Sequence, residues 1–409
     1  MSQSLTYHRD LRTGRTIWMA RRRLPIPVAR LTKNARCDVV VIGAGISGAI
    51  IAENLTDAGL QVIILDRRGV IEGSTAASTA LLQYEIDTPL TTLRDTIGRD
   101  KAERIWRRSK LAVDALRERT ERWGISADAA TRNALYLNGN VLDAGGLERE
   151  AAARRAIGLE ATVLQPSELE AHCGIRNRHA LLSSGNYAAD PRQLAAGFLN
   201  KAIERGAVVY TPVDVQHLSP HANGVTVFTE DEPEIDAQQV ILATGYEMIK
   251  GVPRKHNRIT SSWVIATRPQ PRALWPDQSM IWEAATPYLY IRTTPKGAII
   301  CGGEDEDIAD ARERDAKIPA KARVLSEKLS ALLPGIDATP VFAWAGSFGD
   351  NPLGIPTVGR IPRMPGCYAA MGYGGNGITF SMMAGQILRA LIMGERDADA
   401  DLFSFYRTY

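Results

Sequence analysis

The pattern of apolar and polar residues predicts a strand, a helix and a second strand between residues 38 and 66. Residues 38–42 form a short β-branched run of the kind that lies in a parallel sheet buried on both faces. The apolar residues of 49–55 predict a helix that ends near Gly59, because a glycine there can adopt the left-handed conformation that closes a helix. A further apolar run at 61–65 predicts the neighbouring strand.

A glycine turn joins the first of these strands to the helix, and its spacing predicts a dinucleotide site. One glycine permits the tight turn, the next lets the backbone approach a pyrophosphate, and the third lets the helix pack against the strand. The free N–H groups and the dipole of the helix N-terminus then favour an anion. The alternative is a glycine-rich packing turn without a ligand. The predicted contact residues are Gly43, Gly45, Ile46, Ser47 and Gly48.

Asp66 ends the second strand and is followed by a long loop of small residues, 67–80. The position of Asp66 lets its carboxylate accept hydrogen bonds from the ribose hydroxyls of an adenosine. Small side chains in the loop would let backbone N–H groups approach a flat ring system, although a Ser/Ala-rich loop without a ligand is the alternative. The candidate contacts in this loop are Arg67, Ser74, Thr75 and Ser78.

Later segments resume the same parallel sheet. Asp190 is a predicted N-cap with Pro191 at the first helical position, and this helix continues to Gly206. A three-strand meander with Asn223-Gly224 as its hairpin turn follows, and a buried strand returns at 239–245.

The remaining periodicity predicts a second, antiparallel unit and a second glycine turn. Alternating strands occupy 262–267, 288–293 and 298–303, and helices are expected at 101–123, 146–172 and 309–332. Residues 366–379 read as a strand, a glycine turn and the start of a helix at 381–393. This turn supplies a second helix N-terminus that can hold an anion.

The cysteines and the apolar runs of the sequence indicate the cellular environment of the protein. The four cysteines, Cys37, Cys173, Cys301 and Cys367, lack the spacing of a zinc site or a disulfide framework, which favours a reducing, cytoplasmic environment. No apolar run reaches the roughly 18 residues of a membrane span.

Residues 1–36 form a basic arm with nine Lys and Arg, including Arg21-Arg22-Arg23, against one acid, Asp10. The whole chain carries only +3, so the body is acidic. Such an arm could touch nucleic acid or an acidic membrane. We expect instead an arm that folds over the acidic body or contacts a partner subunit, with no nucleic acid involved.

Three motifs in this order resemble the flavin oxidoreductases of the D-amino-acid oxidase, glycine oxidase and sarcosine oxidase family. They are GAGISG with Asp66, ILATGY ending at Tyr246, and MGYGGNGIT at 371–379. The resemblance implies FAD, with adenine contacted by a valine of the meander and the flavin ring by the C-terminal turn. The residues implied are Val213 or Val215, Ala243, Thr244, Gly245, Gly374, Gly375, Asn376, Gly377, Ile378 and Thr379.

The resemblance also implies a reaction, the two-electron oxidation of a C–N bond in a small amine or amino acid. An unprotonated amine would pass its α-hydrogen as hydride to flavin N5, and the imine would hydrolyse. Sarcosine oxidases attach their flavin to a cysteine, but residues 341–356 contain none, so FAD is expected to be non-covalent. The lysine that serves oxygen in those enzymes falls near Ile300, where no lysine stands, which leaves oxygen or a carrier as the acceptor.

The substrate residues are less clear from sequence. Glycine-oxidase-like relatives carry a carboxylate-binding arginine just after Trp-Ala-Gly, whereas this chain has Phe348 at the end of 344–348. Arg292 shares one strand face with Tyr288 and Tyr290, so these three are the candidate catalytic residues. A solvent-facing arginine beside half-buried tyrosines is the alternative.

These observations predict an α/β fold in which a Rossmann-like FAD-binding domain is interleaved with an antiparallel-sheet α+β substrate domain. The predicted FAD-binding domain comprises 37–100, 161–258 and 340–409. The predicted substrate domain comprises 101–160 and 259–339, with a helical insert.

Three classes of function remain at this point. The leading class is an FAD-dependent amine or amino-acid oxidoreductase. A flavin hydroxylase or an NAD(P)-dependent dehydrogenase would share the first motif, but a nicotinamide site does not need the C-terminal glycine turn. A flavin-bearing subunit of a larger dehydrogenase complex would use the basic arm for docking.

Overall fold

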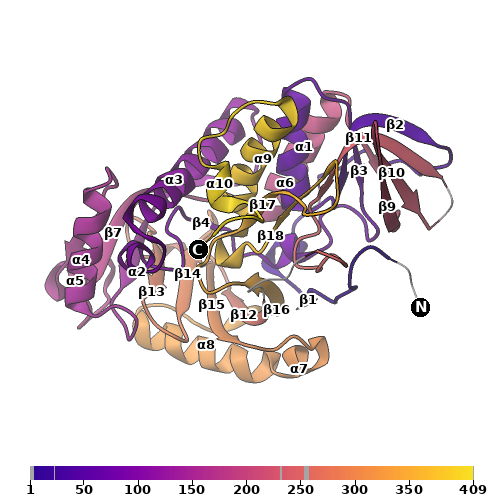
Figure 1. The fold of residues 1–409 in the computed structure, drawn as a ribbon. Coiled ribbons are helices and arrows are strands. Elements are labelled where there is room, and N and C mark those ends of the chain that lie inside the picture. Colours follow the sequence, from indigo (N-terminus) through magenta and orange to yellow (C-terminus); the bar gives the residue numbers. More distant parts are fainter. Residues whose placement is uncertain (1–3, 23, 231–232, 253–257, 409) are drawn as a thin grey trace.

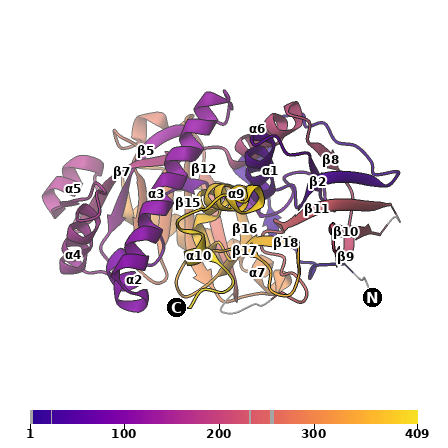
Figure 2. The ribbon, with the colours of Figure 1, turned by 45° about the horizontal axis from the view of Figure 1, so that its top comes forward.

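A computed structural model of the chain describes residues 4–22, 24–230, 233–252 and 258–408, so Arg23 of the arginine run lies outside the described residues. Two sheets lie side by side, and the chain passes between them several times (Figures 1 and 2). Helices α1, α6 and α9 gather over the first sheet, while α7 and α8 run along the second (Figure 1).

The first sheet has the order β17-β18-β11-β2-β3-β8, and β10 joins it by pairing with both β11 and β9. Strands β2, β3, β8, β11 and β18 pair in parallel, as the apolar runs predict. The strands are β2 (Ala35–Ile42), β3 (Val62–Leu65), β8 (Val208–Tyr210), β9 (Val215–His221), β10 (Gly224–Thr229), β11 (Glu234–Leu242), β17 (Thr357–Arg360) and β18 (Cys367–Met371).

Both faces of this parallel sheet are buried. Val39, Val41 and Ile64 pack in one core with helices α1 (Ile46–Asp57), α6 (Pro191–Glu204) and α9 (Gly377–Met393). The alternate residues Val40 and Ile63 pack in a separate core with the meander β9–β11. The capping predictions are confirmed: the Asp190 side chain accepts the first N–H groups of α6, and Gly59 lies at φ +84° just after α1.

The second sheet has the order β1-β16-β12-β15-β14-β13-β5-β7-β4, with β6 paired to β7. Its pairs are antiparallel, as predicted, except for the parallel pair of β13 with β5. The strands are β1 (Arg12–Gly14), β4 (Leu81–Leu82), β5 (Ala130–Leu137), β6 (Thr162–Leu164), β7 (Ala180–Ala188), β12 (Arg258–Thr267), β13 (Met280–Glu283), β14 (Leu289–Thr293), β15 (Ile299–Glu306) and β16 (Pro340–Asp350).

Helices flank the second sheet on one side and connect it to the first. Leu325 and Leu329 of α8 pack onto Trp263 and Ile291 of the sheet. The long helix α3 lies against α9, between the two halves of the molecule (Figure 2). The helices are α2 (Leu90–Ile97), α3 (Arg99–Arg122), α4 (Ala144–Arg155), α5 (Pro166–Cys173), α7 (Ala311–Ala316), α8 (Ile318–Leu332) and α10 (Ala400–Phe403).

Three segments of the predicted FAD-binding domain contribute strands to the second sheet. Within 37–100, β4 pairs with β7. The segment from 161 contributes β6 and β7, because β7 pairs with β5. The segment from 340 begins with β16, which pairs with β12. Apolar periodicity identifies a strand but does not say which sheet it joins, so the division into domains stays a prediction.

The basic arm packs on the body of its own chain. Leu5, Leu11 and Trp18 are buried, and β1 adds an edge strand to the second sheet beside β16. Its arginines meet carboxylates of the body: Arg12 with Glu72 and Arg21 with Asp190. None of the helices within the described part of the chain is long and apolar enough to cross a bilayer.

Candidate active site

A cavity between the two sheets brings the predicted site residues together. It is lined by the first glycine turn, the loop after Asp66, the start of the meander, the end of β11, the tyrosines of the second sheet and the C-terminal glycine turn. Every residue predicted for the site lines this cavity except Gly48, Thr379 and Arg292.

The first glycine turn has the geometry of an anion cradle. A Cβ on Gly43 (φ +116°) would lie 2.3 Å from the Ala243 carbonyl oxygen, and one on Gly48 would lie 1.8 Å from the Gly43 carbonyl oxygen. Gly48 therefore serves the close packing of helix and strand rather than the cavity wall. Gly45 precedes α1, whose Ile46 N–H donates to the Thr75 hydroxyl at 2.9 Å. The first turn has no acidic residue, so its other N–H groups and the helix dipole can hold an anion.

Asp66 lies at the end of β3 and already accepts three backbone hydrogen bonds. Its Oδ2 accepts from Ala44 N at 2.8 Å, and its Oδ1 accepts from Arg68 N at 2.8 Å and Gly69 N at 3.2 Å. The pKa of the Asp66 carboxyl lies above its ordinary value, because the effect of burial exceeds the opposite effect of these hydrogen bonds. The three donors fix the carboxylate at the cavity wall, where it is available to ribose hydroxyls.

The C-terminal glycine turn also lines the cavity. The 3-10 turn η4 (Gly374–Asn376) leads into α9, whose first turn also lacks an acid and a side-chain cap. Tyr246 donates its hydroxyl to the Gly374 carbonyl at 3.2 Å and so ties the end of β11 to this turn. The Gly375 N–H, expected to face the flavin, donates to Asp87 Oδ2 at 3.1 Å. Thr379 points away from the cavity, with its hydroxyl on the Gln83 carbonyl.

The arm closes the cavity on the side of Asp66, a feature that the sequence did not indicate. Leu5 pairs with the first meander strand through a 2.8 Å bond from its N–H to the Val215 carbonyl. Ser4, Leu5 and Thr6 line the cavity together with Val213 and Val215. The predicted adenine contacts thus lie beneath the arm.

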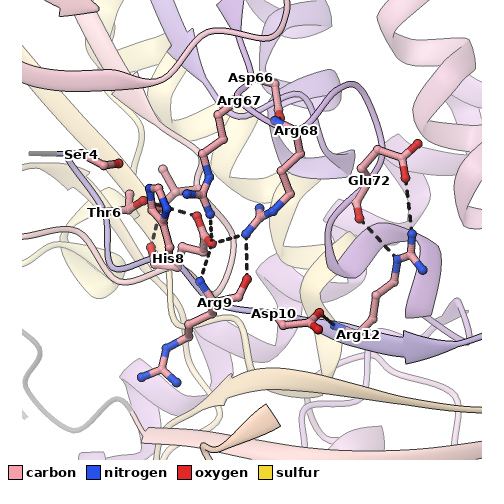
Figure 3. A network of polar contacts seen from close by, with 12 residues as sticks. Ser4, Thr6, His8, Arg9, Asp10, Arg12, Asp66, Arg67, Arg68 and Glu72 are labelled. Atoms are coloured by element: carbon pink, nitrogen blue, oxygen red, sulfur yellow. Dashed lines mark hydrogen bonds and ion pairs between the residues drawn. The ribbon is translucent and has the colours of Figure 1, made fainter. Parts of the chain in front are cut away.

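One buried carboxylate, Glu247, joins the arm to the loop after Asp66. Figure 3 shows Thr6 and Arg9 of the arm beside Arg67 and Arg68 of this loop. Glu247 accepts hydrogen bonds from the Arg9 N–H at 2.9 Å and from the Thr6 hydroxyl at 3.3 Å. It also forms ion pairs with Arg67 and Arg68. Arg67, predicted as a cofactor contact, therefore has a second role in holding this junction.

The tyrosines of the second sheet line the part of the cavity near the C-terminal turn. The Tyr288 and Tyr290 rings lie 5.7 Å apart, and the Tyr290 hydroxyl is 2.9 Å from that of Ser262. Gly302 leaves room for Tyr290, since a Cβ there would lie 2.4 Å from its ring. Burial, and then the charge of Asp305, raises the pKa of both phenols above their ordinary values.

Arg292 requires a correction, because the structure places it outside the cavity. The side chain is 1% exposed, and its Nη1 donates to the carbonyls of Thr79, Ala80 and Ala189 at 3.1, 2.7 and 2.8 Å. Trp18 of the arm packs on the guanidinium at 5.4 Å. Strand alternation predicted correctly that Arg292 shares a sheet face with Tyr290. The loop at 79–80 and Trp18 of the arm cover the part of that face where Arg292 lies, so its side chain does not reach the cavity.

The residues present fit a bound FAD. The N-termini of α1 and α9, neither with an acidic residue in its first turn, line one cavity with a fixed carboxylate at the end of β3. Sequence reasoning missed several wall residues, because the loops and strands that bring them together are far apart in the chain. These residues are Glu85, Asp87, Glu247, Trp282, Asp305 and the arm segment 4–6.

Comparison with known proteins agrees with this geometry. A family model described as FAD dependent oxidoreductase matches residues 38–391. The gamma-glutamylputrescine oxidoreductase of Escherichia coli is 23% identical over 91% of this chain and 87% of its own length. Glycine oxidase from Geobacillus kaustophilus superposes with a TM-score of 0.74 at 22% identity, covering 92% of this chain and 100% of that one. L-proline dehydrogenase from P. horikoshii gives 0.76 at 21% identity, covering 92% and 98%.

Proposed function

Because the chain belongs to the family of FAD-dependent oxidoreductases, we propose that it oxidises the C–N bond of a small amine or amino acid. FAD is its cofactor, and when bound it accepts a hydride at N5. The product would be an imine, which water hydrolyses to a carbonyl compound and an amine.

The observation that carries this proposal is that Tyr288 and Tyr290 line the same cavity as the C-terminal glycine turn. A substrate between them would be held against the place where the turn 374–378 receives a flavin ring. Burial keeps both phenols neutral, so they can donate or accept hydrogen bonds without adding a charge to the reacting centre. The surrounding wall residues would orient the C–H bond and exclude water.

The relatives support an amine or amino-acid substrate. Three of them are named after such a compound: gamma-glutamylputrescine, glycine and L-proline. A non-covalent FAD is supported by the cavity itself, because its lining within the described residues includes neither cysteine nor histidine.

Anaerobic reduction of the purified holoenzyme tests the proposal. Amines and amino acids are added in turn, and loss of the oxidised-flavin absorbance identifies those that donate a hydride. Oxygen and an artificial acceptor are then compared for reoxidation, which distinguishes an oxidase from a dehydrogenase with a carrier. Reduction by NAD(P)H alone, with none by any amine, would contradict the proposal and favour a hydroxylase or nicotinamide-dependent enzyme.

A further inference from the structure

The four carbonyl groups of loop residues 77–80 are all held by side chains outside the cavity. These loop residues line the cavity, whereas the three side chains that donate to them do not. The bonds are Trp344 Nε1 to Ala77 at 2.9 Å, Trp18 Nε1 to Ser78 at 2.8 Å, and Arg292 Nη1 to Thr79 at 3.1 Å and to Ala80 at 2.7 Å. Because these oxygen atoms accept bonds from donors outside the lining, the loop presents little of its own negative partial charge to the cavity.

Arg292 also places a full positive charge behind this loop. It shares a sheet face with Tyr290, which lies two residues earlier on β14 and lines the cavity. The guanidinium bonds directly to the carbonyl groups of lining residues 79–80, so its charge lies one peptide layer behind the cavity wall. The ring of Trp18, 5.4 Å from the guanidinium, covers it from the side of the arm.

The charge of Arg292 has no carboxylate partner, in contrast to those of two other buried arginines. Arg154 and Arg314 are as deeply buried, but Arg154 pairs with Glu150 at 2.9 Å and Arg314 pairs with Asp315 at 2.8 Å. Within the part of the chain that the structure describes, Arg292 donates to carbonyl groups and forms no ion pair. A buried cation without a counter-charge is costly, and negative charge on a ligand beside it reduces that cost.

The carboxylates that act on Arg292 from further away are already engaged. Asp128 and Asp190 raise its pKa, but both are paired with Arg21. Burial has the larger effect and lowers the pKa of Arg292 to about 9, so the group is still charged at neutral pH. The cavity wall therefore contains a permanent positive charge that water does not screen.

We infer that the charge of Arg292, held behind residues 77–80, stabilises the reduced form of the bound flavin and so raises its reduction potential. The small residues of this loop are the ones expected to face the flavin ring. A hydride brings negative charge to that ring, and a fixed positive charge in a water-excluded wall stabilises negative charge that develops beside it. The inference goes beyond the proposed function, because it concerns the cofactor and does not depend on the substrate that supplies the hydride.

Midpoint potentials of the purified holoenzymes test the inference without a substrate. Each protein is reduced chemically under anaerobic conditions beside a reference dye, and the absorbances of flavin and dye are compared at equilibrium. Arg292→Gln removes the charge but keeps an N–H donor. It should shift the ratio of reduced to oxidised flavin at least about 10-fold towards the oxidised form, which lowers a two-electron midpoint by about 30 mV. Arg292→Lys keeps the charge and should retain most of the wild-type potential.

The matched control is Trp344→Phe, which removes a hydrogen bond to Ala77 of the same loop without changing the charge. Its midpoint potential should stay close to that of the wild type. A wild-type potential in Arg292→Gln would overturn the inference. An equal fall in Arg292→Gln, Arg292→Lys and Trp344→Phe would also overturn it, because the position of the loop would then set the potential.

A second pair of variants leaves Arg292 in place and serves if Arg292→Gln does not fold. Trp18→Glu puts a carboxylate beside the guanidinium, and Trp18→Gln puts a neutral group of the same shape there. The midpoint of Trp18→Glu should be at least about 30 mV lower than that of Trp18→Gln, which again is a 10-fold change in the ratio. Equal potentials in this pair would contradict the role of the charge.

The two proposals fail in different ways. If the potentials change as expected but no amine reduces the flavin, the oxidation of a C–N bond is wrong and the role of Arg292 stands. If amines reduce the flavin but the loss of the charge leaves the potential unchanged, the reaction stands and the role of Arg292 is wrong.

Discussion

Arg292 joins β14 to two other segments through its bonds to Thr79 and Ala80 of the cavity wall and to Ala189. Arg292→Ala should lower the free energy of unfolding by about 3 kcal/mol or more, because it leaves buried carbonyl groups without donors. It should not discriminate between substrates with and without a carboxylate. Chemical denaturation and kcat/KM for such a pair check both expectations.

The control for that variant is Arg268→Ala, since Arg268 is 67% exposed and its nearest carboxylate, Asp337, is 3.8 Å away. A selective loss of the carboxylated substrate in Arg292→Ala would restore the substrate role that the strand pattern suggested.

Asp66 is the predicted ribose contact, and its three backbone donors hold it in place. Asp66→Asn should weaken FAD binding by about 10- to 100-fold, since one charge-assisted hydrogen bond contributes roughly 1.5–3 kcal/mol. Equilibrium titration of the apoprotein with FAD measures the change. Asp236→Asn is the control, because Asp236 pairs with Arg36 at the surface of the same sheet. An FAD affinity equal to that of the wild type would contradict the role of Asp66.

Tyr288 and Tyr290 have pKa values raised by burial and by Asp305, so both should stay neutral where a free tyrosine, with a pKa of about 10, would ionise. The rate of flavin reduction, followed from pH 6 to about pH 10, should therefore show no falling limb from these groups. A limb near pH 10 that disappears in Tyr288→Phe would show that this phenol ionises in the ordinary range.

At the scale of elements, the arm and the loop after Asp66 form one junction at Glu247. Glu247→Gln removes the partner of Arg67 and Arg68 and weakens the attachment of residues 6–9. Its FAD should dissociate at least several-fold faster than that of the wild type, measured by loss of flavin to an excess of a competing apoprotein. Arg36→Gln breaks the exposed pair with Asp236, which lies away from this loop, and is the control. Equal dissociation rates in Glu247→Gln and the wild type would mean that the arm does not retain the cofactor.

The sequence predicted a helix or strand correctly where the residues that determine it lie within the element or next to it. The strand and helix of 38–57 follow from a β-branched run and a glycine turn, and the start of α6 follows from Asp190 and Pro191. The packing of the arm could not be predicted in this way. The residues that contact its buried side chains, such as Leu5 and Trp18, lie in distant segments of the chain.

At the scale of the whole molecule, the site was only partly predictable, because both sheets contribute to it. The FAD contacts follow from motifs, since each glycine turn carries its own geometry. Glu85 lies in a loop and Asp305 lies on β15, and neither belongs to a motif that would place it in the cavity that Tyr288 and Trp282 line. The set of side chains that lines the cavity is therefore a property of the tertiary structure.

The four cysteines are all buried and none lines the cavity, which argues for a cofactor held without a covalent bond. Burial raises the pKa of Cys37 to about 12 and that of Cys367 to about 11, so neither forms a thiolate near neutral pH. Acid precipitation of the holoenzyme should leave yellow FAD in the supernatant. Colour retained in the washed pellet would show a covalent link and contradict this expectation.

The strand β1 pairs with β16, so a strand near the start of the chain has its partner in the last quarter of the sequence. During synthesis, residues 12–14 leave the ribosome early and must wait for residues 340–350 before that pairing can form. Contacts between such distant segments form late, because a long loop has to close first. The arm should therefore dock after both sheets have assembled, which leaves an interval in which the folded apoprotein is open on the adenosine side and FAD can enter.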